Sequence, residues 1–253
     1  MTGLLLNTNP VLHVDDGGRD TVSVLFVHSL AGNCSHWFSQ LEHLRRDRRA
    51  IALDLRGHGL SGMASDGDYT ISALADDIKS AAEALNLQKF FLVGHSLGAS
   101  AAIEFAGRHP EMLAGLLLAD PSGDARKLPA EVMGPFLDAM QSEAYVSTIE
   151  EYWKSMIAVS NPAIQEKLLS DLRSTGKDVV TEAFRSTLKF DPLTPLERYS
   201  GRKLSVITDL NDTPISLHNL LADLPHVRIS GTGHWLQLDR PEEFNRILDA
   251  FLR

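Results

Sequence analysis

The chain has 253 residues, of which 43% are hydrophobic and 23% charged. This composition is typical of a globular protein with a buried core, and the length suffices for one large domain or for a core domain with an insert. The formal net charge of −9 argues against a general nucleic-acid binder, because such proteins need a basic surface to neutralise phosphates.

Cysteine usage and the first residues bear on cellular location. Cys34 is the only cysteine in the sequence, so no intrachain disulfide can form. The first ten residues hold a run of three leucines but no basic region and no long apolar stretch, so we expect no signal peptide. No window approaches the roughly 20 apolar residues that a membrane span needs. The expected location is therefore cytoplasmic and reducing.

Short apolar runs alternate with helix-like stretches in the first half of the chain. The predicted strands are residues 21–28, 50–55, 90–93 and 113–119. Such runs indicate strands buried on both faces, as in a parallel sheet. Residues 71–85 place their apolar side chains on one helical face, and the alanine-rich residues 99–108 directly follow a strand. This order predicts right-handed βαβ units and an α/β fold with a doubly wound, mostly parallel sheet.

The pattern changes after Pro121. Helix-like segments without a convincing strand occupy residues 129–189, and strands return at 204–208 and 227–230 before a final helix at 245–252. We therefore predict three parts, which are the first part of an α/β core at 1–121, a helical cap insert at 122–200, and the second part of the core at 201–253. Ligands of open α/β sheets bind beyond the carboxyl ends of the strands, so an insert that leaves from a strand end would roof that site.

The strongest functional motif is the pentapeptide Gly94-His95-Ser96-Leu97-Gly98, which lies between a predicted strand and a predicted helix. Side chains at positions 94 and 98 would collide with neighbouring backbone in a tight strand-to-helix turn, so the motif needs glycine there. The turn would raise the Ser96 hydroxyl above the sheet and place the Leu97 N–H at a helix N-terminus, where it stabilises negative charge. The alternative is an ordinary loop serine, which this context disfavours. Ser96 is the predicted nucleophile.

A serine hydroxyl needs a base to become a good nucleophile. The best candidate is His234, which lies in a glycine-rich segment after a predicted strand, where a loop can return the imidazole to the serine. A structural histidine is the alternative. The other histidines fit less well, because His58 lies in a turn, His95 lies inside the motif and should point away from the pocket, and His109 ends a helix.

Together these motifs resemble the α/β-hydrolase family over essentially the whole chain. Two further matches are residues 54–61, which look like the turn after an early strand, and residues 235–244, which look like the start of the last helix. Residues 28–32 resemble the oxyanion loop of the family, where His-Gly precedes a residue that donates its N–H. The resemblance gives that role to the backbone N–H of Leu30, beside that of Leu97. Ser29 stands where the family usually has glycine.

The resemblance also implies a catalytic acid, for which three aspartates are candidates. The family usually places it after the strand that is here 203–208, in a glycine-x-x-aspartate pattern whose glycine is missing from this chain. Asp209 is the first choice, because it best keeps the spacing to the next helix and to His234. Asp212 best keeps the spacing from the strand, and Asp120 follows the preceding strand, as in some relatives. Each could instead cap a helix or a turn. The acid would orient the imidazole and stabilise its charged form.

Other side chains give weaker signals. Trp37, Phe38, Trp153 and Met156 are candidates for a pocket wall, although their helical spacing favours an ordinary core. The histidines are scattered, and the sequence holds neither a metal-binding motif nor a dinucleotide fingerprint. We therefore expect no cofactor and no metal.

These observations predict a carboxylesterase-like serine hydrolase that cleaves a carboxylic ester or a related acyl compound through an acyl-enzyme on Ser96. The expected partner is a small-molecule ester. The same scaffold also supports carbon–carbon hydrolases, lyases and cofactor-free oxygenases, all of which keep the serine–histidine pair. A ligand-binding receptor with a retained triad, or an inactive relative, is a further alternative. The sequence leaves the substrate and the oligomeric state open.

Overall fold

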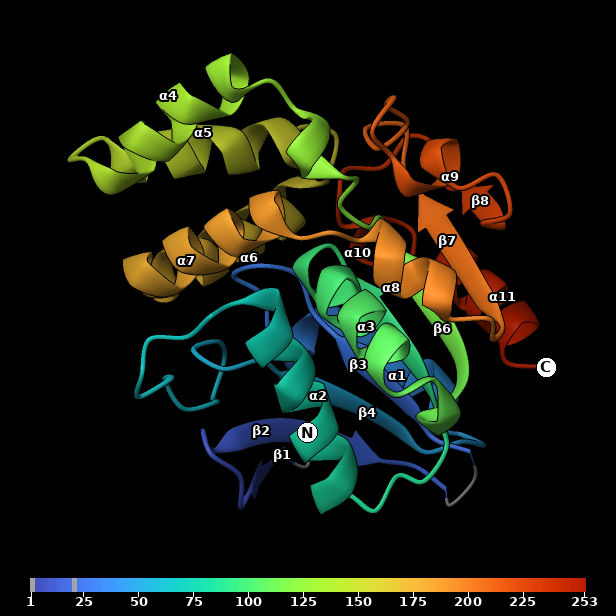
Figure 1. The fold of residues 1–253 in the computed structure, drawn as a ribbon. Helices are drawn as coiled ribbons and strands as arrows, with labels where there is room; N and C mark the ends of the chain where they lie inside the picture. Colours follow the sequence, from blue (N-terminus) through green and yellow to red (C-terminus); the bar gives the residue numbers. More distant parts are fainter. Residues whose placement is uncertain (1–2, 20–21) are drawn as a thin grey trace.

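The computed structural model describes residues 3–19 and 22–253 (Figure 1). Thr21, the first residue of a predicted strand, lies outside the described residues. In the described part of the chain, eight strands form one sheet in the order β1-β2-β4-β3-β5-β6-β7-β8. Their bounds are β1 Gly3–Leu6, β2 Leu12–Gly17, β3 Val24–Val27, β4 Ala50–Asp54, β5 Phe90–His95, β6 Leu113–Ala119, β7 Lys203–Ile207 and β8 His226–Arg228. All pairs from β4 to β8 are parallel, which confirms the predicted doubly wound α/β fold.

The two strands at one edge of the sheet are antiparallel and are absent from the sequence-based expectation. β1 pairs with β2, and β2 pairs with β4. Most of β1 is exposed, and β2 contains His13, Asp15 and Asp16, so neither reads as an apolar run. A search for continuous apolar runs, which identifies strands buried on both faces, therefore does not detect β1 and β2.

Helices cover both faces of the sheet. Their bounds are η1 Cys34–Trp37, α1 Phe38–Leu44, α2 Ile71–Ala84, α3 Leu97–Arg108, η2 Pro110–Met112, α8 Leu193–Arg198, α9 Leu217–Leu220, α10 Leu236–Asp239 and α11 Pro241–Phe251. Side chains alternate along β3, so Leu25 and Val27 pack under α2, α3 and α8, whereas Val24 and Phe26 pack under α1, α10 and α11. The sheet is thus buried between two apolar layers (Figure 1).

A group of helices separates β6 from β7, and we call it the helical insert. It contains η3 Ala125–Lys127, α4 Ala130–Gln141, α5 Tyr145–Met156, α6 Pro162–Ser174 and α7 Lys177–Lys189, and no strand among the residues described. Asn161 caps α6 by accepting the Ile164 N–H at 3.0 Å, and Pro162 occupies its first turn. The insert lies beyond the carboxyl ends of the strands (Figure 1). His36 of η1 fastens it to the core through Asp171 of α6, with Nε2 at 2.9 Å from Oδ2.

No helix in residues 3–19 and 22–253 combines the length and the apolar character that crossing a bilayer requires.

Candidate active site

Ser96 occupies a strained turn between β5 and α3. Its backbone has φ +52° and ψ −113°, a conformation that non-glycine residues rarely adopt, and its N–H donates to the Ala119 carbonyl at 3.1 Å. A Cβ at Gly94 would lie 2.3 Å from the Gly98 carbonyl oxygen. A Cβ at Gly98 would lie 2.4 Å from the carbonyl oxygen of His28. Both glycines are therefore required, and the start of α3 packs directly on the end of β3.

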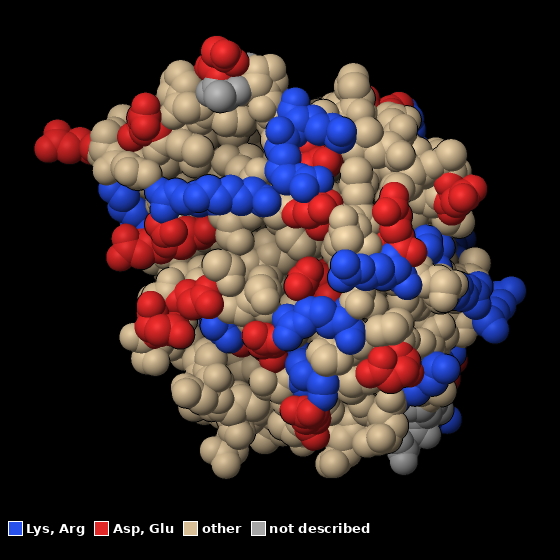
Figure 2. All heavy atoms as spheres, viewed as in Figure 1, with Lys and Arg blue, Asp and Glu red and all other residues tan. Residues whose placement is uncertain are grey.

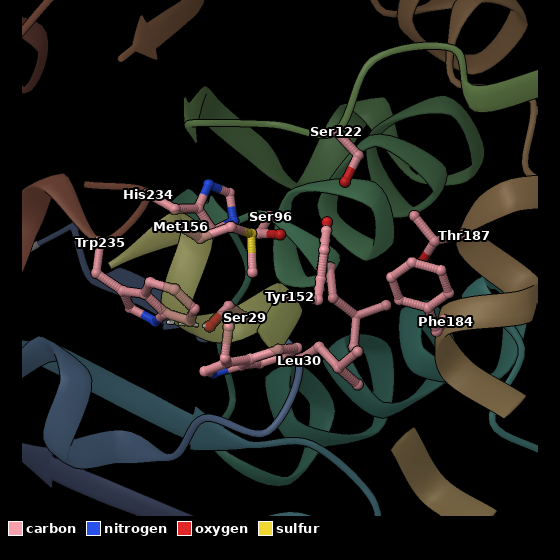
Figure 3. Close-up of a pocket in the computed structure, with 12 residues that line it drawn as sticks. Ser29, Leu30, Ser96, Ser122, Tyr152, Met156, Phe184, Thr187, His234 and Trp235 are labelled. Carbon is pink, nitrogen blue, oxygen red and sulfur yellow. Dashed lines mark hydrogen bonds between the residues drawn. The ribbon is translucent and has the colours of Figure 1, made fainter. Parts of the chain in front are cut away.

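His234 contacts a buried aspartate. Its Nδ1 lies 2.5 Å from Oδ2 of Asp120, a side chain with no exposed surface. The end of β7 holds that carboxylate, because the Thr208 N–H donates to Oδ1 at 2.8 Å and the Thr208 hydroxyl donates to Oδ2 at 3.1 Å. Since Asp120 engages Nδ1, the other ring nitrogen, Nε2, is the one left for a reaction partner. His234 and Ser96 line the same cavity (Figure 3).

The other two candidate acids lie elsewhere. Asp209, the first choice from the sequence, is half exposed and accepts the Gly231 N–H at 3.1 Å and the Ser230 hydroxyl at 3.0 Å, which lower its pKa. Asp212 pairs with Arg228 and Asn219. Neither has a hydrogen bond to His234 among the described residues. The structure therefore brings Asp120, the alternative from the preceding strand, to the histidine.

The strand order explains why Asp120, and not Asp209, contacts His234. β6 lies directly beside β5, which carries Ser96, whereas β7 lies one strand further away. Adjacent strands are about 4.8 Å apart, so a carboxylate that follows β6 starts nearer to the serine than one that follows β7. Spacing along the chain contains no information about this lateral order.

The backbone of His234 is held on both sides. Its N–H donates to the Met156 carbonyl at the end of α5 at 3.0 Å, and its own carbonyl accepts the Nε2–H of His95 at 2.9 Å. His95 is fully buried, and burial holds its pKa well below the ordinary value, so the ring is neutral. Its Nδ1 can then accept from Gln237 at 3.3 Å. His95 thus supports His234 from behind and does not line the cavity.

Two backbone N–H groups are placed near Ser96. Leu97 is the first residue of α3, so its N–H lacks an intrahelical acceptor. Leu30 lies in the loop after β3, and both leucines line the cavity together with Ser96. His28 shapes this loop, because Nδ1 donates to the Ser29 carbonyl at 2.7 Å and Nε2 accepts the Leu55 N–H at 3.1 Å. Burial lowers the pKa of His28 to about 3, so it is neutral.

Ser29 lies in the loop after β3, at the position where the sequence resemblance leads one to expect glycine. Its side chain makes a contact that glycine could not make. Its hydroxyl accepts the indole N–H of Trp235 at 3.0 Å, and the serine is only 1% exposed (Figure 3). This hydrogen bond ties the loop that carries Leu30 to the loop that carries His234. The sequence shows the substitution but offers no signal for its partner.

The cavity beside Ser96, which we call the Ser96 cavity, has a volume of about 630 Å³. It is covered by α4, α5 and α7 of the helical insert, and a narrow extension of about 60 Å³ reaches Leu30, Trp153 and Trp235. Trp153 and Met156, which the sequence names as candidates for a pocket wall, line it. Trp37, another of these candidates, is fully buried in the core and does not line the cavity. Phe38 is 55% exposed and lies neither in the core nor in the cavity wall.

One group among the described residues has the chemistry and spacing of a metal site. The possible ligand atoms of His13, Cys34 and Asp54 lie within 4.8 Å of one another. Asp54, however, already accepts His13 Nδ1 at 2.7 Å, the Cys34 N–H at 2.6 Å and the Leu60 N–H at 2.9 Å. The hydrogen bond to Asp54 raises the pKa of His13. We therefore interpret the group as an ion pair between His13 and Asp54 that holds the turn after β4 against β2.

Curated relatives match nearly the whole chain. An sn-1-specific diacylglycerol lipase of Mus musculus, ABHD11, is 26% identical over 260 residues, which cover 94% of this chain and 83% of the relative. A putative carbamate hydrolase of Rhizobium rhizogenes, RutD, is 30% identical over 251 residues, which cover 92% of this chain and 94% of the relative.

Solved structures share the same fold. A thermophilic esterase from Thermogutta terrifontis is similar with a TM-score of 0.83 at 24% identity, over 100% of this chain and 98% of that one. A bromoperoxidase from Bacillus anthracis is similar with a TM-score of 0.86 at 19% identity, over 99% of each chain. The Alpha/beta hydrolase family matches residues 24–247, from β3 into α11. The resemblance inferred from the sequence motifs is thus confirmed, and the chain belongs to the alpha/beta hydrolase family.

Proposed function

We propose that the protein is a serine hydrolase that cleaves a carboxylic ester, or a related acyl compound, through an acyl-enzyme on Ser96. The observation that carries this proposal is the position of His234. Its Nδ1 lies 2.5 Å from Asp120, and the ring lines the cavity of Ser96. A serine, an imidazole and a buried carboxylate in this order are the parts that acyl transfer needs.

Each part has a defined task in the reaction. Nε2 of His234 accepts the hydroxyl proton as Ser96 Oγ attacks the carbonyl carbon, and Asp120 holds the tautomer and stabilises the imidazolium. The N–H groups of Leu30 and Leu97 bind the negative oxygen of the tetrahedral intermediate. The imidazolium then protonates the leaving alcohol, which leaves an ester on Ser96. A water molecule, deprotonated by the same histidine, releases the acid and restores the serine.

The geometry supports Asp120 as the acid of this triad in place of Asp209. Asp120 is buried, and three donors converge on its carboxylate, of which His234 is one. A carboxylate in this setting stays in place during the reaction. Asp209 instead joins the surface of the loop that carries His234 through Ser230 and Gly231.

The relatives support hydrolysis at a carbonyl in general. Their names include a diacylglycerol lipase and a carbamate hydrolase. Diacylglycerols and carbamates both contain a carbonyl carbon that is bonded to oxygen or nitrogen. The complete acid–base pair favours turnover over a receptor role, because a receptor has no need of an oriented imidazole. A cytoplasmic location stays a prediction from cysteine usage.

The test is the hydrolysis of a p-nitrophenyl ester series, from acetate to decanoate, by the wild type and by Ser96→Ala. We expect turnover of at least one member and a loss of about 10³-fold or more in Ser96→Ala, since the hydroxyl is the attacking group. Mass spectrometry after treatment with a fluorophosphonate should show one adduct in the wild type and none in the variant. Equal rates in the two proteins, or no turnover by folded wild type, would count against the proposal.

A further inference from the structure

The wall of the Ser96 cavity is mainly apolar. Side chains from the insert and from the loop after β7 supply this surface, and they are Leu128, Met133, Phe136, Phe184, Leu188 and Ile215. Its volume of about 630 Å³ lies in the range of small-molecule sites, which take part of their affinity from buried apolar area. A substrate therefore places an apolar portion against this wall.

The wall contains almost no charge. No lysine or arginine lines the cavity or its narrow extension among the residues described. Within the described part of the chain, Asp120 is the only carboxylate in the lining, and its oxygens already accept from Thr208 and His234. An anionic group would find no cationic side chain of lysine or arginine in this space.

Two basic residues, Arg126 and Lys127, lie on η3 at the border of the cavity. Arg126 donates to Asp124 at 2.8 Å and to Asp191 at 2.8 Å, so its charge is already balanced. Lys127 is exposed and does not line the cavity. On the face drawn in Figure 2, basic side chains are interspersed with acidic ones, so this face presents no uniformly positive surface that would attract an anion.

The hydroxyl groups of the wall are neutral polar groups. The Ser155 hydroxyl donates to the Tyr152 carbonyl at 2.6 Å, and the Thr187 hydroxyl donates to the Ala183 carbonyl at 3.0 Å, so both are engaged within their own helices. The hydroxyls of Ser122 and Tyr152 have no hydrogen bond among the described residues, and both point toward the space beside Ser96 (Figure 3). They can serve a neutral acceptor or hydroxyl on the substrate.

We infer that the Ser96 cavity selects uncharged, mainly apolar esters and discriminates against substrates that carry a carboxylate away from the scissile bond. This inference rests on the proposed function. A substrate carboxylate would have to lose its water in the cavity without meeting a cation, and it would also face the negative charge of Asp120. An alkyl group of the same shape loses only unfavourable contacts with water.

The experiment compares two p-nitrophenyl esters with the same shape. The acyl group of 6-methylheptanoate ends in two methyl groups, whereas that of adipate ends in two carboxylate oxygens at the same positions. We expect kcat/KM to be about 100-fold higher for the neutral ester, because nothing in the wall compensates the desolvation of the anion. A ratio below about threefold, or a preference for the adipate, would overturn the inference while leaving the proposed hydrolase intact.

A matched pair of variants tests whether the wall is the cause. Met133→Lys places a cation in the lining, and Gln141→Lys adds the same charge to an exposed position of the same helix. We expect Met133→Lys to raise kcat/KM for the adipate ester and narrow the preference at least about tenfold, since the cation stabilises the anion. Gln141→Lys should keep the wild-type ratio. Equal ratios in the two variants would contradict an origin in the cavity wall.

Binding separates this inference from the proposed function. Calorimetry on Ser96→Ala with the p-nitroanilides of the same two acids measures the selectivity without any hydrolysis. Tighter binding of the 6-methylheptanoyl compound supports the inference even if the wild type cleaves no ester. Equal or tighter binding of the adipyl compound refutes it, whatever the activity of the wild type.

Discussion

The turns that follow β6 and β7 both carry aspartates at the carboxyl ends of the strands, but these aspartates make different contacts. The turn after β6 buries Asp120 against His234, whereas the turn after β7 leaves Asp209 half exposed beside Ser230 and Gly231. The end of β7 contributes Thr208, which holds Asp120 in place through two hydrogen bonds. Which carboxylate contacts His234 thus depends on its lateral position in the sheet and on its burial, not on its distance along the chain.

The largest effect expected from this contrast is on activity. Asp120→Asn should lower kcat by about 10³- to 10⁴-fold, because the amide offers an N–H to Nδ1 and stops stabilising the imidazolium. Asp209→Asn, the matched change in the neighbouring turn, should stay within about threefold of the wild type, since its contacts are with the loop surface. Steady-state rates on the best ester of the series measure both. The reverse order of losses would contradict the proposed role of Asp120 and favour Asp209 as the acid.

The buried middle of the sheet and its exposed edge should also differ in their response to pH. His28 and His58, at the ends of β3 and β4, have pKa values lowered by burial to about 3 and about 4, against 6.5 in an unfolded chain. Between pH 6.5 and these lowered values, the two histidines bind more protons in the unfolded chain than in the folded protein. Their contribution to the free energy of unfolding is therefore fully present above pH 6.5 and is lost as the pH falls toward the lowered pKa values. Each histidine contributes a slope of up to about 1.4 kcal/mol per pH unit.

Denaturant titrations between pH 7.5 and pH 4.5 measure this loss. His58→Asn keeps a donor for the Arg56 carbonyl, which accepts Nδ1–H at 2.9 Å, but it removes the titrating ring, so its stability should fall less steeply with acid. His226→Asn, the same substitution at an exposed histidine on β8, is the matched control. A slope in His58→Asn as steep as that of the wild type would show that this ring titrates normally in the folded protein.

A smaller effect is expected where the loop after β3 meets the loop that carries His234. Ser29→Ala leaves the buried Trp235 indole N–H without its acceptor, which should cost about 1–3 kcal/mol of unfolding free energy. Because the hydrogen bond joins the loops of Leu30 and His234, kcat should fall several-fold while KM changes little. Thermal and denaturant unfolding test the first effect. Ser147→Ala, at an exposed hydroxyl in α5, serves as the control. Unchanged stability and kcat would remove Ser29 from any positioning role.

Much of this protein follows from local sequence. The buried parallel strands, the glycines around Ser96 and the glycine-rich loop of His234 are each determined by neighbouring residues, because backbone sterics and burial act over a few positions. A Cβ at Gly94 or Gly98 meets backbone at under 2.5 Å, so the motif admits little else. Local sequence did not predict the antiparallel strands β1 and β2, because the polar residues of β2 are stabilised by tertiary contacts such as that of His13 with Asp54.

Only the tertiary structure decided which aspartate meets His234, what Ser29 contacts and what charge the Ser96 cavity holds. Asp120 and Asp209 both follow strands that end at one edge, and the order of β5, β6 and β7 places Asp120 nearer. Ser29 and Trp235 are separated by 206 positions in the chain and meet through the fold. The cavity wall joins helices of the insert to strand ends. Contacts between distant segments depend on strand order and packing, which no short stretch of sequence encodes.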